Sequence, residues 1–309
     1  MKRTILLFGL LLPIALAVRA ADVPARPRLV GLAHVAFYAA DLNKTRGFYK
    51  DFLGFAEPYW ITNDDGSLRL TFIKINDRQA VELFPEKQAG SDRLYHVALE
   101  TENAEAMRQY LASKGVAVKD KTPIGRSGNA NYFIKDPEGH TIEMVQYLPD
   151  GWTAKDRGLH SPATRVAVRL AHAGIAVTNL ETTLKFYRDI LGFKEIWRGS
   201  RDGKTLSWVH LQVPEGAEFI ELMLETTPER LKSAHHLCFE VPEVAKAAEQ
   251  LKSRPLPAGC KPPTEIKTGI NHKRQINYFD PDGTRVELME PTTVDGKPAP
   301  SFNSGVAPQ

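Results

Sequence analysis

Four histidines along the chain are each followed by a glutamate at a nearly constant interval of 47 to 51 residues. The residues are His34, Glu82, His96, Glu143, His172, Glu221, His236 and Glu287. A single strand histidine is most often a core residue with ordinary hydrogen bonds, but a buried carboxylate without a partner is costly. Recurrence of both types in register therefore indicates a shared role, and imidazole with carboxylate suits a divalent transition metal.

The neighbours of these residues predict the direction in which they point. Each glutamate lies between two aliphatic residues, as Glu82 lies between Val81 and Leu83. Strand side chains alternate between faces. If the aliphatic residues pack under helices, the histidines and glutamates face the opposite, concave side. Two paired units would bring two imidazoles and two carboxylates together, and such a set leaves open positions on a six-coordinate ion, as in catalytic metal sites. The sequence leaves open whether the paired units belong to one module.

An internal duplication supplies the strands that carry these residues. Leu32–Glu57 aligns without a gap with Leu170–Glu195, at an offset of 138 residues. Each copy predicts a strand, an N-cap at Asp41 or Asn179, a helix and a glycine at its end, Gly54 or Gly192. The pattern then restarts near Tyr95 and His236. We therefore expect an α+β fold of two tandem modules, each a pair of βαβββ units.

The N-terminal residues have the layout of a secretory signal peptide. Lys2 and Arg3 precede an apolar run from Ile5 to Ala17, and Val18-Arg19-Ala20 resembles a cleavage site. We expect residues 1–20 to be removed and the protein to be exported, either periplasmic or secreted, without a membrane anchor. Removal leaves 37 basic against 37 acidic residues, so charge gives no reason to expect a nucleic-acid partner.

The remaining boundaries follow from composition. Residues 29–149 and 169–291 form the two modules, residues 150–168 are a polar linker, and residues 292–309 are a Pro/Gly/Ser-rich tail that we expect to be disordered. Cys238 lies in an apolar run, where a buried free thiol is expected, and the sequence does not decide whether it is bridged to Cys260. Either a monomer or a homodimer is compatible with two modules.

The residues from Leu29 to Pro149 and from Arg169 to Pro291 resemble the vicinal oxygen chelate superfamily, which includes glyoxalase I, extradiol ring-cleavage dioxygenases and bleomycin-resistance-type binding proteins. The resemblance rests on His34 followed by Phe48-Tyr49 and Leu53-Gly54-Phe55, on the same pattern after His172, and on the closing runs DPEGHTIE and DPDGTRVE. It implies that each pair of units forms a half-open mixed sheet shaped as a cup, with helices outside.

The resemblance to glyoxalase implies a metal-dependent isomerase or lyase. Its metal ligands would be His34, Glu82, His96 and Glu143 in the first module and His172, Glu221, His236 and Glu287 in the second. The ion would be Ni, Co, Zn or Fe. Catalysis would proceed through a metal-bound enediolate of a small α-hydroxycarbonyl substrate, with Glu143 or Glu287 as the base.

Two alternatives remain open. Extradiol dioxygenases hold Fe(II) with two histidines and one glutamate, which His172, His236 and Glu287 supply. However, Asn277 stands where these enzymes have a tyrosine, and Tyr278 is one residue late, which turns a strand side chain to the other face. The second alternative is a non-catalytic protein that sequesters a small molecule. Such a protein would not need two sets of four metal-ligand residues.

Overall fold

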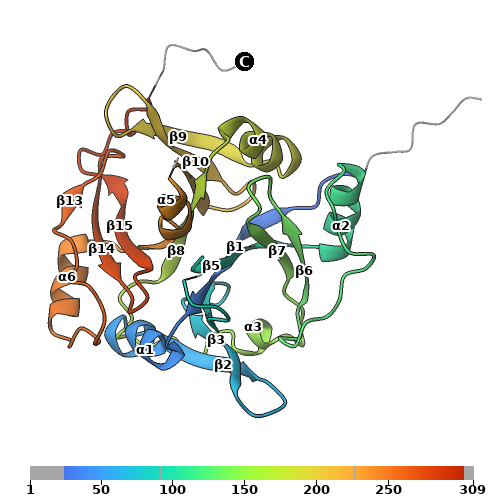
Figure 1. Ribbon diagram of the computed structural model, residues 1–309, viewed down its shortest axis with the longest axis horizontal. Helices are drawn as coiled ribbons and strands as arrows, with labels where there is room; N and C mark the ends of the chain where they lie inside the picture. The colour runs from blue at the N-terminus through green and yellow to red at the C-terminus, as the bar shows by residue number, and fades with distance from the viewer. Residues whose placement is uncertain (1–23, 91, 226, 303–309) are drawn as a thin grey trace, which may run out of the picture.

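The fold consists of two curved mixed sheets with helices on their convex sides (Figure 1), as a computed structural model of the chain shows. The structure describes residues 24–90, 92–225 and 227–302. The expected signal peptide, residues 1–20, lies outside the described residues. Among those described, no helix is long and apolar enough to cross a membrane.

The first sheet contains only strands from the first module, in the order β2-β3-β4-β1-β5-β7-β6. The strands are β1 (Leu29–Ala39), β2 (Ala56–Thr62), β3 (Leu68–Lys74), β4 (Ala80–Pro85), β5 (Leu94–Thr101), β6 (Ala130–Lys135) and β7 (Thr141–Gln146). Strand β1 pairs with β4 in parallel and with β5 antiparallel, and β5 pairs with β7 in parallel. The four central strands thus come from both units of the module.

The second sheet repeats this arrangement with one additional short strand, in the order β13-β14-β15-β12-β8-β11-β10-β9. The strands are β8 (Arg169–Val177), β9 (Lys194–Ser200), β10 (Leu206–Gln212), β11 (Phe219–Leu224), β12 (His236–Glu240), β13 (Lys267–Thr268), β14 (Lys273–Phe279) and β15 (Arg285–Thr293). In the first module the counterpart of β13 is reduced to a single bridge between Ile124 and Ala130. The two modules are therefore copies of one architecture.

The two helices predicted for each module are present near their predicted positions, and two short helices, Trp152–Lys155 and Pro228–Ser233, were not predicted. The helical segments are α1 (Leu42–Gly47), η1 (Phe48–Phe52), α2 (Ala104–Ser113), α3 (Trp152–Lys155), α4 (Leu180–Leu184), η2 (Lys185–Ile190), α5 (Pro228–Ser233) and α6 (Val244–Lys252). The side chains of Asp41 and Asn179 each accept a hydrogen bond from the backbone amide three residues further along the chain, as N-cap residues do. Gly54 has φ +81°, and a Cβ there would lie 2.3 Å from the carbonyl oxygen of Thr164. The last turns, η1 and η2, are π-helical, which the sequence did not indicate.

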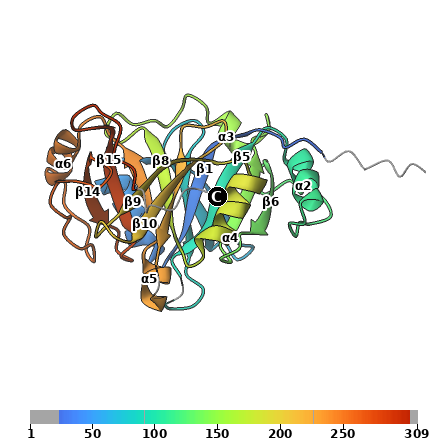
Figure 2. The same ribbon diagram turned by 90° about the horizontal axis from the view of Figure 1, so that it is seen from above.

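The first helix of each module packs against the other module. Asp282, in the turn between β14 and β15, accepts hydrogen bonds from the amide of Ala40 at 2.9 Å and the hydroxyl of Thr45 at 2.7 Å. The equivalent Glu138 accepts one from the amide of Asn179 at 2.7 Å. In Figure 1, α1 accordingly lies beside β14 and α6, and Figure 2 shows α4 beside β6 and α2. Each module is therefore joined to the other through the start of its first helix.

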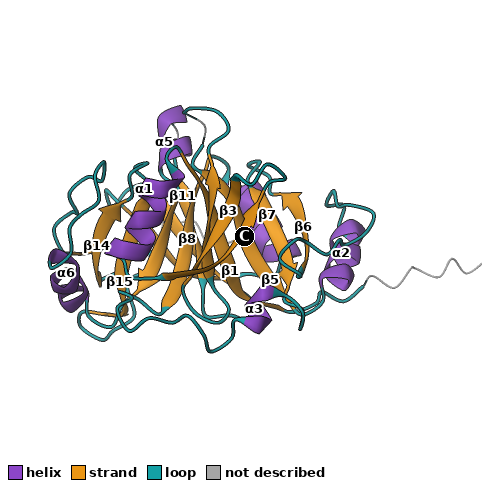
Figure 3. Ribbon diagram, turned by 90° about the horizontal axis from the view of Figure 1, so that it is seen from below, coloured by secondary structure: helices purple, strands orange, loops and turns teal. Residues whose placement is uncertain are grey.

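One hydrophobic core runs through both modules between the sheets and their helices. Val35, Val81, Leu83 and Val97 of the first module and Val286 of the second belong to it, each fully buried. Figure 3 shows the strands as a central band with α6 and α2 at its two ends. The aliphatic neighbours of the predicted ligands therefore face this core, as expected, and the histidines and glutamates face the concave side.

Two segments differ from the expectation of irregular chain. The linker contains α3, whose Trp152 ring stacks on Tyr59 at 5.3 Å between centroids. The tail predicted from residue 292 is not disordered up to residue 302. Strand β15 continues to Thr293, and the indole of Trp197 donates to the carbonyl of Pro300 at 2.9 Å. Composition alone does not show such contacts. Residues 303–309 lie outside the described residues.

Candidate metal centre

The structure brings His34, Glu82, His96 and Glu143 together on the concave face of the first sheet, one from each of β1, β4, β5 and β7. We call them the module 1 cluster. Small residues stand between them: Ala36 pairs with both His96 and Glu82, and Ala98 pairs with both His34 and Glu143. These alanines lie on the same face and leave room for the four longer side chains to meet. The cluster forms within one module.

The ligand atoms of the module 1 cluster converge on one point. Nε2 of His34 lies 2.9 Å from Nε2 of His96 and 3.0 Å from Oε2 of Glu143. Nε2 of His96 lies 3.0 Å from Oε2 of Glu143, and Glu82 approaches the two rings at 3.3 and 3.5 Å. Neighbouring ligands on an ion about 2.1 Å away stand roughly 3 Å apart. The donor set therefore fits a divalent ion.

Electrostatics point the same way. Burial alone disfavours a charged imidazole, but hydrogen bonds and attraction from Glu143 and Glu82 outweigh it and raise the pKa of His96 to about 9. Burial would raise the pKa of Glu143, yet the charges of His34 and His96 and their hydrogen bonds lower it. The buried carboxylates thus require a positive charge between them, which either a proton or a cation supplies.

Sequence reasoning missed one residue of this centre. Asn131, on β6, donates from Nδ2 to Oε1 of Glu143 at 2.6 Å. The bond leaves only Oε2 of Glu143 facing the two histidines. The spacing between Asn131 and Glu143 reflects hairpin pairing of β6 with β7, and one asparagine in a strand gives no signal of this contact.

A cavity of about 210 Å³ opens over the module 1 cluster. His96, Glu82 and Glu143 reach its floor. Its aromatic lining consists of Phe72, Phe84, Tyr95 and Phe133. Arg69 and Arg126 also line it, and neither forms an ion pair with a carboxylate among the described residues. The cavity thus combines an apolar wall with two positive groups.

The second sheet brings the predicted residues His172, Glu221, His236 and Glu287 to the matching place, and we call them the module 2 cluster. Their atoms do not share one point. They form two overlapping groups of three that share His172, one with Glu221 and His236 and the other with Cys238 and Glu287. Oε2 of Glu287 also lies 3.6 Å from Nε2 of His236. Nε2 of His172 is 3.2 Å from Nε2 of His236 but 3.9 Å from Oε2 of Glu287. Cys238 is buried and Cys260 is partly exposed, and both are free thiols.

Additional charged groups enter the module 2 cluster. Nε2 of His210, from β10, lies 3.0 Å from Oε1 of Glu221. Nη2 of Arg285 lies 2.6 and 2.7 Å from the ring nitrogens of His236. Burial, reinforced by the charge of Arg285, lowers the pKa of His236 to about 4. Burial raises the pKa of Glu287 to about 7, with Arg285 opposing and Glu221 adding to the rise. The two clusters differ in their electrostatics.

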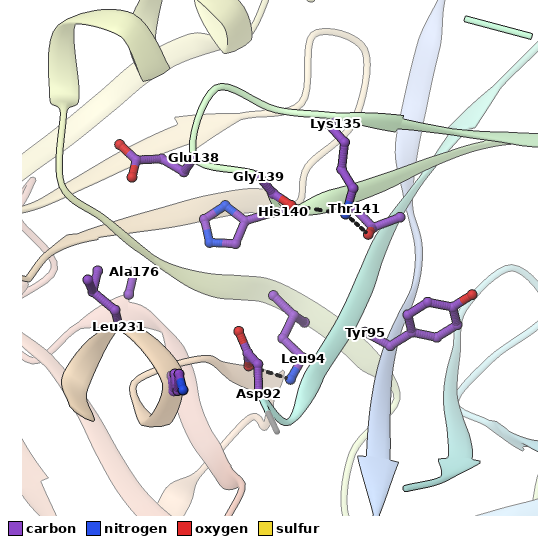
Figure 4. Close-up of a pocket in the computed structure, with 11 residues that line it drawn as sticks. Asp92, Leu94, Tyr95, Lys135, Glu138, Gly139, His140, Thr141, Ala176 and Leu231 are labelled. Atoms are coloured by element: carbon purple, nitrogen blue, oxygen red, sulfur yellow. Dashed lines mark hydrogen bonds between the residues drawn. The ribbon is translucent and has the colours of Figure 1, made fainter. Parts of the chain in front are cut away.

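His140, outside both clusters, lines a cavity of about 290 Å³ between the modules (Figure 4). Nδ1 of His140, in the turn between β6 and β7, lies 2.8 Å from Oδ2 of Asp136. Its ring lies 5.2 Å from that of His235, which faces away from the module 2 cluster, as the parity of β12 predicts. Among the described residues, they do not belong to any group of three converging ligand atoms.

Comparisons with known proteins agree with this architecture. The Glyoxalase/Bleomycin resistance protein/Dioxygenase superfamily model matches residues 31–144 and 169–288. The chain therefore belongs to this superfamily, whose modules are the two sheets described above.

Several of the individual relatives belong to two enzyme groups. The chain is 29% identical to an iron-dependent extradiol dioxygenase from Rhodococcus jostii over 53% of its own length and 54% of that protein. It is 24% identical to a lactoylglutathione lyase from Arabidopsis thaliana over 63% and 66% of the two chains. The match thus spans about half of the dioxygenase. An extradiol ring-cleaving dioxygenase from Brevibacterium fuscum has the same fold, with TM-score 0.67 and 18% identity over 90% of this chain and 76% of that one.

Proposed function

We propose that the module 1 cluster holds a divalent metal ion and that the protein is a glyoxalase I-like isomerase or lyase acting on a small α-hydroxycarbonyl compound. The observation that carries this proposal is the convergence of four ligand atoms, with Nε2 of His34 within 2.9 to 3.3 Å of atoms of the other three residues. Two neutral imidazoles and two carboxylates suit Ni, Co, Zn or Fe. A related lactoylglutathione lyase supports the reaction class.

A bound ion would supply polarisation of the substrate's two oxygens, which lowers the cost of removing the proton between them. Glu143 is the proposed base. It takes the proton from the hydroxyl-bearing carbon, and the electron pair moves toward the carbonyl. The hydroxyl proton then passes to the former carbonyl oxygen, and Glu143 returns its proton to the former carbonyl carbon. Asn131 holds Oε1 of this carboxylate at 2.6 Å and so fixes which oxygen faces the reacting carbon.

The cavity indicates the class of substrate. Arg69 and Arg126 at its edge favour an anionic group, and Phe72, Phe84 and Phe133 favour an apolar or aromatic one. We therefore expect a small α-hydroxycarbonyl compound that carries a carboxylate. Because residues 1–20 resemble a signal peptide, we propose that the protein meets this substrate outside the cytoplasm.

Solvent exchange tests the reaction directly. The metal-loaded protein is incubated in D2O with a panel of small α-hydroxyketones, with and without a carboxylate, and NMR follows deuterium at the carbons beside the oxygens. We expect incorporation with the wild type and none with Glu143→Gln. Binding of panel members without exchange or turnover would contradict the proposal and support a non-catalytic binding protein.

The second candidate function is an Fe(II) extradiol-type ring-cleavage dioxygenase. The similarity to an iron-dependent extradiol dioxygenase favours it, and three of the four module 1 ligands would suffice for that chemistry. The same preparation, loaded anaerobically with Fe(II), is mixed with catechols and oxygen. Oxygen uptake with ring-cleavage absorbance, in the absence of deuterium exchange, would favour this candidate over the isomerase.

A further inference from the structure

An arginine side chain lies against the module 2 cluster. Arg285 lies two residues before Glu287 on β15, and its Nη2 is 2.6 Å from Nδ1 and 2.7 Å from Nε2 of His236. The same atom is 3.9 Å from Oε2 of Glu221. The guanidinium therefore packs against the imidazole of His236 and lies near the carboxylate of Glu221, both of which the sequence predicts as metal ligands.

The first module has no such group. The residue two positions before Glu143 is Thr141, which accepts a hydrogen bond from Lys135 at 2.7 Å outside the cluster (Figure 4). A threonine hydroxyl is short and uncharged. The space that Arg285 fills in module 2 is thus left to the four ligand residues in module 1.

The strand beneath His236 is adapted to this arrangement. Gly174 on β8 pairs with His236, and a Cβ at Gly174 would lie 1.9 Å from Cε1 of that ring. The imidazole therefore rests directly on the backbone of β8, and its Nδ1 approaches the carbonyl oxygen of Ala234 at 3.1 Å. In module 1 the residue that pairs with His96 is Ala36. Module 2 thus differs from module 1 at two neighbouring positions. Arg285 brings a guanidinium to the cluster, and Gly174 allows the ring of His236 to lie directly on strand β8.

The carboxylates of module 2 are also drawn apart. Glu221 is shared between His210, at 3.0 Å, and His236, at 3.3 Å. Glu287 belongs to a different group with Cys238. In module 1 the position of His210 is taken by Phe72, which pairs with Glu82 and offers it no hydrogen bond. The two carboxylates of module 2 therefore do not join both histidines in a single group of ligand atoms, and a guanidinium lies against one of those histidines.

We propose that Arg285 takes the place of a metal ion in module 2, so that this module is a metal-free pocket and the chain binds one ion only. A fixed guanidinium beside the ligands repels a divalent cation and already satisfies the negative charge of Glu221. The pocket over it, about 130 Å³, is lined by Trp197, Trp208 and Gln275. A ligand there would meet arginine donors instead of a Lewis acid.

Cobalt titration of the full-length mature protein tests the proposal. Co²⁺ alone is the probe, and visible absorbance together with elemental analysis gives the number of ions per chain. We expect one ion in the wild type, none in His96→Ala, and one in His236→Ala. Arg285→Thr introduces the residue of module 1, alone and together with Gly174→Ala, and at least the double variant should bind a second ion. Arg285→Lys, which keeps the positive charge, is the matched control and should bind one.

The same substitutions are repeated in the His96→Ala background, where a gained ion can only belong to module 2. This separates the inference from the proposed function of module 1, because the gain is expected even if module 1 proves inactive. An ion in wild-type module 2 that His236→Ala removes would overturn the inference. Arg285→Thr and double variants that retain the circular dichroism spectrum of the parent and still gain no ion would overturn it as well.

Discussion

Glu143 is held from two sides, and this decides how the module 1 cluster can act. Its Oε2 faces both histidines at 3.0 Å, and its Oε1 accepts from Asn131 at 2.6 Å. Partners behind a ligand orient it and tune its basicity. The sequence could predict Glu143 because its register repeats in four strands, but it could not predict Asn131, whose role exists only across one hairpin.

At this scale we predict that Asn131→Ala weakens metal binding or activity by about 10- to 100-fold, because the carboxylate of Glu143 loses its second anchor. Metal affinity and turnover are measured side by side. Gln275→Ala in module 2 removes the polar residue of the corresponding hairpin position and should leave both values unchanged. Equal effects of the two substitutions would show that Asn131 has no special role.

The turns between the last two strands of each module act beyond their own module. Asp282 and Glu138 occupy equivalent positions, and each accepts a hydrogen bond from a backbone amide at the start of the first helix of the other copy. The sequence identified the turns and the helices, but it treated each module by itself. The sequence could not predict that the first helix of each module packs against the other module. The hydrophobic pattern of an amphipathic helix is compatible with any convex apolar sheet face.

Asp280 gives this element a pH dependence. Burial, with the nearby charge of Asp282, raises the pKa of Asp280 from its ordinary value of 3.8 to about 7. The folded state therefore binds this proton more tightly than the unfolded state. The resulting stabilisation is complete below the unfolded pKa and is lost as the pH rises toward 7, by about 1.4 kcal/mol per unit at most.

We predict that Asp280→Asn removes this part of the pH dependence between about pH 4 and 7. Urea unfolding at several pH values measures it, as the difference between the wild type and the variant. Asp64→Asn, which removes an exposed carboxylate, is the control. Parallel profiles for the wild type and Asp280→Asn would mean that Asp280 titrates as an ordinary aspartate in the folded protein.

The two modules share one hydrophobic core, and this defines the behaviour of the whole molecule. Buried residues of both sheets, such as Leu83 and Leu222, belong to the same cluster, and the rings of Phe55 and Phe239 meet across the modules at 5.0 Å. Repetition in the sequence predicted two modules of the correct class and both sets of candidate ligands. It did not predict that the modules depend on each other, because contacts between copies leave no periodic signal.

We therefore predict a single cooperative unfolding transition. Trp60 and Trp152 report on module 1, and Trp197 and Trp208 report on module 2. Variants that keep only one module's tryptophans, with phenylalanine at the other two positions, are unfolded in urea and followed by fluorescence. The midpoints should coincide once the small stability cost of each substitution is measured by circular dichroism. Two clearly separated transitions in the same variant would show independent modules.

The central claim is that module 1 holds the ion on which the chemistry depends. Its most direct test is elemental analysis of the protein purified from its native host without added metal, beside His96→Ala and His236→Ala. The account predicts close to one ion of nickel, cobalt, zinc or iron per chain, retained in His236→Ala and lost in His96→Ala. An ion that disappears only in His236→Ala, or a wild-type protein without any ion, would contradict it.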